Sequence, residues 1–399
     1  MNKLTSPQLR THDDVLIALA KAIDIPDHLF EKATSRYEAI GRHLEESSLS
    51  QYDPKISPQG SMLLGTVIRP LDDSDEFDID LVCKLEADKK TFTQQGLKAS
   101  VGEEIKAYAK ANAMQNPPEE GKRCWTLVYS KDDKFHMDIL PALPDQSTFR
   151  TFLENKGHWH AASQAYLVDH AIAITDQEDK NYETVSEDWP VSNPKGFAIW
   201  FSSKHSQEME RRKTLRVNEG VYMKVDDVPD HKVKTPLQRA IQLLKRHRDS
   251  MYKGSDDAPI SIIITTLAAH SYQGEQSLSA ALKTILMNME DYIENRGREK
   301  WVQNPVNPEE NFADKWPKHP EREEAFYTWL AAAQRDFGRF MNGPISSPPD
   351  LFKSAMTQTT YSKVANRIAT VAAAAVATSL KAETEAYEET GRDHQPWVS

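Results

Sequence analysis

The sequence predicts an α+β protein in which a mixed β-sheet backed by helices faces a helical lobe across a central cleft. Two short segments predict the sheet, because residues 76–82 and 135–140 alternate apolar and polar side chains, as strands with one buried face do. A third observation predicts the lobe: beyond about residue 200, apolar residues recur at the spacing of amphipathic helices. Helices segregated from a sheet in this way are typical of α+β folds.

The chain length of 399 residues suits two domains or one large bilobal unit. We divide the chain into N-terminal helices that bridge the two lobes (1–49), a core that contains the sheet (50–200) and a helical domain with a loose C-terminal tail (201–399).

Charge and cysteine content exclude several classes of protein. The formal net charge of −11 argues against broad electrostatic binding to nucleic acid. Cys83 and Cys124 are the two cysteines, too few for a structural zinc site without suitably spaced histidines, and we expect a reducing cytoplasm as the location. The N-terminus lacks the apolar core of a signal peptide, and no apolar run is long enough to span a bilayer, so no membrane association is expected.

The first half of the chain reads as helices that precede and interrupt the strands. Helical periodicity, β-rich composition and the helix breakers Pro194 and Gly196 give the order of elements. In order, we expect a short helix (8–24), a long helix that backs the sheet (26–46), a strand (66–69), the strand with two carboxylates (76–82), a helix (98–112), a hairpin (125–129 with 135–140) and a loop (192–200).

The second half reads as helices. Thr235 is a good N-cap and Pro236 a good first residue for a basic helix that also carries Lys245. The expected helices are 200–213, 236–249, one that begins near Ser261, 278–296 and 321–342.

Three carboxylates mark the predicted sheet. Asp78 and Asp80 lie on one face of their strand because side chains alternate, and Asp138 has the same position on the later strand. If the two strands are antiparallel neighbours, all three carboxylates face one space. Like charges so close repel unless a cation lies between them, and oxygen ligands suit two Mg²⁺ ions, or Mn²⁺. The alternative for the Asp-x-Asp pair alone is an exposed strand face.

A small-residue segment precedes these strands. Gln59, Gly60 and Ser61 form a Gly-Ser turn whose backbone N–H groups can approach an anion closely, and the Ser61 hydroxyl can bond a phosphate. The segment is not a Walker loop, because no Gly-Lys-Ser/Thr follows. Together with the carboxylates, it predicts a nucleotide-phosphate site.

Gly-Ser, then Asp-Ile-Asp, then a later Asp on a strand resembles the nucleotidyltransferase superfamily related to DNA polymerase beta. The longer motifs 60–66, 76–82 and 136–141, with the helical half, resemble the bacterial cGAS/DncV-like cyclic-oligonucleotide synthases (CD-NTases, the SMODS family) of CBASS anti-phage defence. This resemblance covers nearly the whole chain. It implies a polymerase-beta-like palm in residues 50–200, two-metal catalysis by Asp78, Asp80 and Asp138, and a cyclic di- or trinucleotide product that acts as a second messenger.

The resemblance also implies further contacts and partners. Lys245 would contact the triphosphate and Ser261 the nucleotide; the alternatives are a solvated lysine and a helix-capping serine. The expected substrates are nucleoside triphosphates, ATP first, with GTP or others as alternatives. Regulatory or conjugating proteins from the same operon are expected partners, and no obligatory nucleic-acid activator is expected from so acidic a chain.

In the mechanism we expect, Asp78 and Asp80 ligate both metals and Asp138 ligates the metal that activates the acceptor hydroxyl, which attacks the α-phosphate of the donor and releases pyrophosphate. Three alternatives stay open. One is a template-independent nucleotidyltransferase acting on RNA ends or on a protein, one is a nucleotide-binding scaffold without activity, and one is a nucleic-acid-binding interaction protein. The sequence leaves the bases, the ring size and the 2′–5′ or 3′–5′ linkages undetermined.

Overall fold

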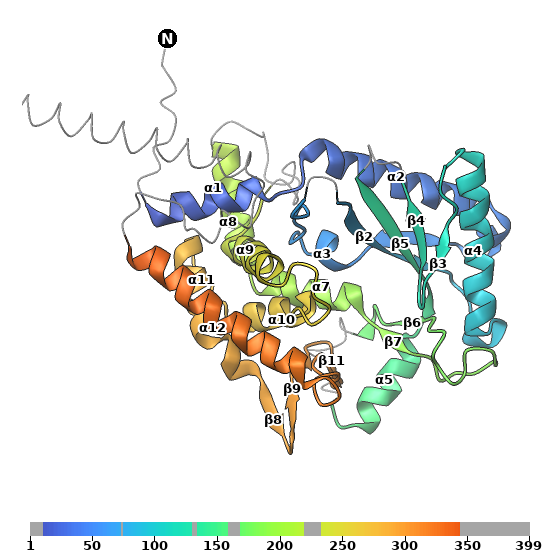
Figure 1. The fold of residues 1–399 in the computed structure, drawn as a ribbon. Coiled ribbons are helices and arrows are strands. Elements are labelled where there is room, and N and C mark those ends of the chain that lie inside the picture. Colours follow the sequence, from blue (N-terminus) through green and yellow to red (C-terminus); the bar gives the residue numbers. More distant parts are fainter. Residues whose placement is uncertain (1–10, 73–74, 130–133, 159–167, 219–232, 344–399) are drawn as a thin grey trace, which may run out of the picture.

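The computed structural model describes residues 11–72, 75–129, 134–158, 168–218 and 233–343. Within them, a sheet with helices behind it lies beside a helical half, as Figure 1 shows. The predicted α+β architecture is confirmed.

The main sheet has seven strands in the described residues, in the order β1-β2-β5-β4-β3, with β6 paired to the end of β5 and β7 paired to β6. The strands β2 and β5 are parallel and every other neighbouring pair is antiparallel, so the sheet is mixed. The strands are β1 (Lys55–Pro58), β2 (Phe77–Lys84), β3 (Glu119–Glu120), β4 (Trp125–Val128), β5 (Phe135–Pro144), β6 (Ile172–Ile174) and β7 (Val191–Ser192).

The expectation that the two carboxylate strands are antiparallel is wrong. From β2 the chain crosses behind the sheet in α4 (Gln94–Ala111), returns through β3 and β4, and turns from β4 into β5. The predicted β4–β5 hairpin is confirmed, and it leaves β5 running in the direction of β2. Asp80 then lies opposite Asp138 in the register, so the carboxylates share a face in spite of the error.

The apolar face of the sheet packs against α2 (Asp27–Glu45) and α4 (Figure 1). Phe77, Ile79 and Leu81 of β2 are buried in this core with residues of both helices. The long helix predicted to back the sheet is therefore confirmed as α2. The opposite face carries the carboxylates and faces the helical half.

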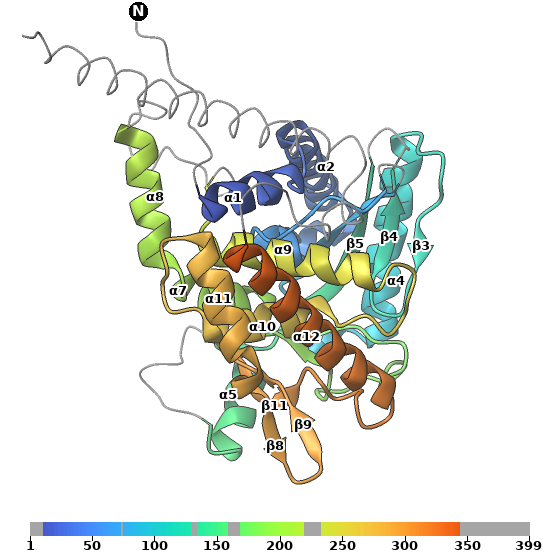
Figure 2. The same cartoon turned by 60° about the vertical axis from the view of Figure 1, so that its left-hand side comes forward.

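The helical half has its own core, built from side chains of α1, α7, α9, α10, α11 and α12. α12 packs against α9 and α11, and Figure 2 shows α1 above α9. Trp329, Phe326 and Phe337 of α12 are buried at its centre. The helices are α1 (His12–Ala22), α7 (Pro194–Ser203), α8 (Ser206–Asn218), α9 (Pro236–Met251), α10 (Ser261–Ser271), α11 (Leu278–Asn288) and α12 (Pro320–Asn342).

The loop predicted for residues 192–200 is wrong, because helix α7 begins at Pro194. A proline at the first helical position costs no backbone bond, and the Asn193 side chain accepts a bond from the Gly196 amide as an N-cap. The single helix predicted for 200–213 is in fact the end of α7 and then α8. Both helix breakers of the sequence therefore mark a helix start.

The helix predicted for 278–296 ends earlier, at Asn288. A 3-10 turn (Met289–Tyr292) follows, and two small antiparallel pairs occupy the region that follows. These strands are β8 (Glu294–Arg296), β9 (Glu299–Trp301), β10 (Gln303–Asn304) and β11 (Asn307–Asn311).

Among the described residues, none of the helices combines the length and the apolar character that crossing a membrane requires. The tail assigned to the end of the chain lies outside the described residues. The predicted boundaries near residues 49 and 200 stay predictions, although α1 packs in the helical core and α2 in the sheet core.

Candidate active site

The carboxylates of β2 and β5 lie on the side of the sheet that faces the helical half. Asp78 is opposite His136 and Asp80 is opposite Asp138. The Thr126 hydroxyl on β4 donates a hydrogen bond to Asp138 Oδ1 at 2.5 Å. Burial, followed by the charges of Asp78 and Asp138, raises the pKa of Asp80. The alternative of an exposed strand face holds for the Asp78 side chain, which is 67% accessible. It does not hold for Asp80, which is partly buried.

Asp78 also contacts a histidine that the sequence interpretation left without a role. His136 Nε2 lies 3.1 Å from Asp78 Oδ1, and His136 Nδ1 lies 3.5 Å from Glu76 Oε2. The sequence could have indicated His136, because residues 136 and 138 are two positions apart on one strand and their side chains therefore lie on the same face.

The carboxylate set fits a divalent cation by its chemistry. Within the described part of the chain, no three His, Cys, Asp or Glu side chains converge closely enough to hold a metal ion. Asp80 nonetheless carries the electrostatic penalty of two neighbouring carboxylates, which a divalent cation would relieve. A Mg²⁺ ion commonly takes only one or two carboxylates and completes its shell with water and substrate phosphates, so three converging side chains are not required.

The Gly-Ser turn packs directly on Asp80. It forms a one-turn helix, α3 (Gly60–Leu63), and the Gln59 amide donates to the Asp80 backbone carbonyl at 2.8 Å. Gly60 has φ +58°, and a Cβ at this position would lie 2.4 Å from Asp80 Oδ2. A glycine is required here both by the backbone conformation and by the close approach of the carboxylate.

A hollow of about 410 Å³ lies between the carboxylate strand and helices α9 and α10. Gly60, Ser61, Asp78 and Asp80 line it from the sheet side. The side chains that line it from the helical side are Lys245, Arg248, Asp249, Ser261, Ile262 and Thr265.

A second hollow of about 280 Å³ shares part of this wall. Gln59 lies in this second hollow, beside the aromatic rings of Phe197 and Phe312. The two hollows meet at Gly60, Leu64, Asp80 and Ile262, so space for two ligands adjoins one carboxylate.

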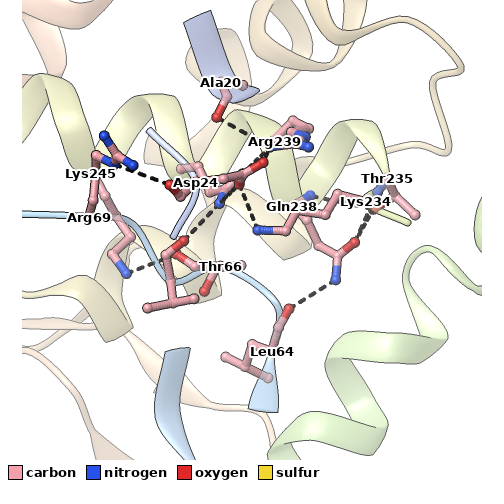
Figure 3. A network of polar contacts seen from close by, with 12 residues as sticks. Ala20, Asp24, Leu64, Thr66, Arg69, Lys234, Thr235, Gln238, Arg239 and Lys245 are labelled. Carbon is pink, nitrogen blue, oxygen red and sulfur yellow. Dashed lines mark hydrogen bonds and ion pairs between the residues drawn. The ribbon is translucent and has the colours of Figure 1, made fainter. Parts of the chain in front are cut away.

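The structure brings Lys245 and Ser261 to the hollow. Lys245 is 6% exposed, so the alternative of a solvated lysine is wrong. Its ammonium donates to the Thr66 carbonyl at 3.1 Å, as Figure 3 shows. Burial, and then the charge of Arg248, lower the pKa of Lys245 to about 8, while Asp249 and Asp80 act in the opposite direction.

Arg248 is a cation of the hollow to which the sequence interpretation gave no ligand role. Its Nη1 donates to Ser261 Oγ at 3.1 Å and to the Pro259 carbonyl at 2.7 Å. The capping alternative for Ser261 is also wrong, because Ile260 is the N-cap residue and no side chain caps α10. The sequence could have indicated Arg248, because it is three residues from Lys245 on one helix and residues at that spacing are neighbours on the helix surface.

Residues 54–141 match the family model described as the nucleotidyltransferase domain of cyclic GMP-AMP synthase DncV-like proteins. The chain carries a DncV-like nucleotidyltransferase domain. The matched residues contain the Gly-Ser turn and all three aspartates, and the protein is a nucleotidyltransferase enzyme.

Two relatives match most of the chain. A protein named c-di-GMP synthase from Roseivirga ehrenbergii is 29% identical over 337 residues, which are 82% of this chain and 79% of the relative. The cyclic dinucleotide synthase CdnG from Bradyrhizobium diazoefficiens is 27% identical over 326 residues, 77% of this chain and 70% of the relative.

A solved structure supports the fold. The structure of the Bradyrhizobium diazoefficiens CD-NTase CdnG in complex with GTP has a TM-score of 0.64 and 21% identity, covering 92% of this chain and all of that one. The predicted polymerase-beta-like fold of the nucleotidyltransferase is confirmed.

The strand predicted for residues 66–69 of the nucleotidyltransferase domain is wrong. Residues 64–70 form neither strand nor helix, and side chains of α9 satisfy their carbonyls in place of a neighbouring strand. Figure 3 shows the bonds from Gln238 to Leu64 and from Lys245 to Thr66. The donors and acceptors are Gln238 to Leu64 (3.0 Å), Lys245 to Thr66 (3.1 Å), Gln242 to Val67 (2.8 Å) and Arg246 to Arg69 and Pro70.

Proposed function

We propose that this nucleotidyltransferase joins two nucleoside triphosphates into a cyclic dinucleotide. The observation that carries the proposal is the register of β2 and β5, which sets Asp80 opposite Asp138 and beside Asp78. Asp78 and Asp80 border a hollow whose far wall carries Lys245 and Arg248, and Asp138 lies next to Asp80 without lining that hollow. Carboxylates on one side and cations on the other suit a metal-bound triphosphate.

Asp78, Asp80 and Asp138 would hold two Mg²⁺ ions, or Mn²⁺, which when bound neutralise phosphate charge and lower the pKa of a ribose hydroxyl. The protein's own groups bind and orient the nucleotides. Lys245, Arg248 and the start of α10 at Ser261 face the triphosphate, and α3 presents backbone N–H groups. The acceptor hydroxyl loses its proton to solvent and attacks the donor α-phosphate, forming an O–P bond as the bond to the β-phosphate oxygen breaks and pyrophosphate leaves. A second transfer of the same kind, which releases a second pyrophosphate, closes the ring.

The names of the relatives guide the choice of substrate. Both are named for cyclic dinucleotides, one of them for c-di-GMP, and the solved relative binds GTP. We therefore propose GTP as a substrate and a ring of two nucleotides, with ATP as the second nucleotide to test. The two adjoining hollows agree with two nucleotides held at once.

Product analysis tests this proposal. The purified protein is incubated with labelled GTP, ATP or both, with Mg²⁺ or with a chelator, and the products are treated with phosphatase and then mapped with linkage-specific nucleases. We expect a small phosphatase-resistant product that forms only with the metal present. Elongated RNA or a labelled protein would contradict cyclisation and support an acceptor of that kind.

We further propose that the product is a cytoplasmic signal in anti-phage defence and that an effector protein from the same operon binds it. Other proteins of that operon regulate the enzyme or conjugate it to further proteins. Deletion of the gene in its native host is expected to increase plaque formation. Unchanged plaque formation by every phage tested would argue against this role.

Replacing Lys245 with Met is expected to raise the KM for the triphosphate about 10- to 100-fold near neutral pH, because a charge-assisted contact is worth about 1.5–3 kcal/mol. The pKa of Lys245 is about 8, so its charge is present below that pH and is lost as the pH rises through it. The wild-type KM should therefore rise between about pH 7 and pH 9.5, whereas the variant's KM should change little. Steady-state kinetics across that range measure both effects.

The matched control is Lys283→Met on α11, an exposed lysine away from both hollows, which should keep the wild-type KM and its pH dependence. A wild-type KM in Lys245→Met would remove Lys245 from the triphosphate site.

A further inference from the structure

The amide of Gln242 on α9 connects three separate parts of the chain while staying outside both hollows. Gln242 is 0% exposed. Its Nε2 donates to the Val67 carbonyl at 2.8 Å and to Asp24 Oδ1 at 2.9 Å. Its Oε1 accepts a bond from Arg239 Nη1 at 3.1 Å. One side chain thus uses both amide hydrogens on partners far from it in sequence.

Asp24, just after α1, is a firmly held partner. Its Oδ1 accepts from Lys234 at 2.8 Å and its Oδ2 from Arg239 at 2.6 Å, and Figure 3 shows this carboxylate among its cations. Burial alone would raise the pKa of Asp24, but the charges of Lys234 and Arg239 outweigh it and hold that pKa below its ordinary value. The carboxylate is therefore ionised and fixed, and it fixes the Gln242 amide in turn.

The other partner, Val67, belongs to the segment that joins the Gly-Ser turn to β2. Thr66 and Val67 line the hollow that holds Asp80 and Lys245. The Thr66 amide donates to the Ser61 carbonyl at 2.9 Å, so the segment is bonded to the turn itself. A shift of the Val67 carbonyl would therefore move one wall of the proposed triphosphate site relative to the other.

We propose that Gln242 is a positioning residue that sets the separation between the Gly-Ser turn and Lys245, and thereby the affinity for the nucleoside triphosphate. This inference rests on the proposed function of the hollow. Gln242 contacts no substrate and acts through the Val67 carbonyl, with Asp24 holding its amide in the correct orientation. Its loss should raise KM with little change in kcat, since the carboxylates of β2 and β5 are not bonded to it.

The test compares two single variants and one double variant. Gln242→Glu keeps the side-chain shape, removes both N–H donors and places a carboxylate beside Asp24, so it should lower Tm and raise KM at least about 10-fold, the cost of a lost hydrogen bond to a needed group. Gln242→Met removes the donors without adding charge, and it should raise KM similarly with a smaller loss of Tm. If Gln242→Glu does not fold, Gln242→Met still tests the proposal.

The double variant Asp24→Asn/Gln242→Glu separates positioning from stability. It exchanges the amide and the carboxylate between the two positions, so the contact between residues 24 and 242 and a partner for Arg239 return. The Val67 carbonyl still lacks its donor. We expect Tm to recover only part of the loss, because Lys234 no longer has its carboxylate at position 24, while KM stays raised. Recovery of KM together with Tm, or a wild-type KM in the single variants, would overturn the inference.

Hydrogen exchange of the nucleotide-free protein provides a readout that needs no activity. Loss of the Val67 anchor should increase amide exchange in residues 64–70, including Thr66 and Arg69, in all three variants. Unchanged exchange there contradicts the inference even if the enzyme makes a cyclic dinucleotide. Conversely, a wild-type protein that makes no nucleotide product contradicts the proposed function, whereas faster exchange would still support the anchoring role.

Discussion

Replacing Asp78 and Asp80 together with Asn is expected to abolish product formation, by at least about 10³-fold in kcat, without making the fold less stable. Asn keeps the shape of the side chain but not the charge that would hold a divalent cation. Burial and the neighbouring carboxylates raise the pKa of Asp80 above its unfolded value, so ionised Asp80 opposes folding at neutral pH. The Tm of the double variant should therefore equal or exceed that of the wild type.

Labelled-product assays and thermal unfolding of the same preparations measure this pair of effects. Asp53→Asn is the matched control, since Asp53 is 65% exposed and has the left-handed backbone that Asn also tolerates. It should change neither activity nor Tm. A double variant that makes product at the wild-type rate would rule out these aspartates as the catalytic carboxylates, and a large fall in Tm would show that they stabilise the fold.

Replacing Gly60 with Ala is expected to lower kcat about 100-fold or more. The added Cβ would lie 2.4 Å from Asp80 Oδ2, so either the carboxylate or the turn must move, and a misplacement of about 1 Å at a reacting centre can cost this much. The positive φ of Gly60 adds a backbone cost of about 1–2 kcal/mol, which should appear as a lower Tm.

A second glycine separates the two effects of Gly60→Ala. Gly297, between β8 and β9, has φ +69° and nothing within 4 Å of a Cβ at its position. Gly297→Ala should therefore show the loss of Tm without the loss of kcat. Equal, near-wild-type kcat in both variants would mean that Gly60 does not position Asp80.

The strand pattern shows how far sequence reasoning reaches at the site. Alternation assigned Asp78, Asp80 and Asp138 to one face of the sheet, and the structure agrees. The prediction that β5 runs antiparallel to β2 was wrong. Side chains alternate between the two faces of a strand in the same way in parallel and antiparallel pairs, so the pattern does not give the direction. Only the path of the chain through α4 and the β4 hairpin decides between them.

Local propensity failed where a distant element supplied the hydrogen bonds. The β-rich residues 66–69 suggested a strand, but α9 satisfies their carbonyls from more than 170 positions along the chain, for example Gln242 to Val67. Pro194 suggested a loop, but a proline is also the preferred first residue of a helix, and Asn193 completes that start. Neither outcome can be read from a window of neighbouring residues.

The sequence by itself determined which side chains are available and on which face each lies: three carboxylates on two half-buried strands, a Gly-Ser turn before them, and a polar helix with Lys245. Only the tertiary structure decided that Lys245 is buried with a pKa of about 8. It also decided that Gly60 packs so closely against Asp80 that a Cβ would not fit. It also brought Arg248 and Ser261 to the same hollow. The physical reason is that alternation and helical periodicity are local, whereas burial, desolvation and close approach depend on segments that meet only when the chain folds.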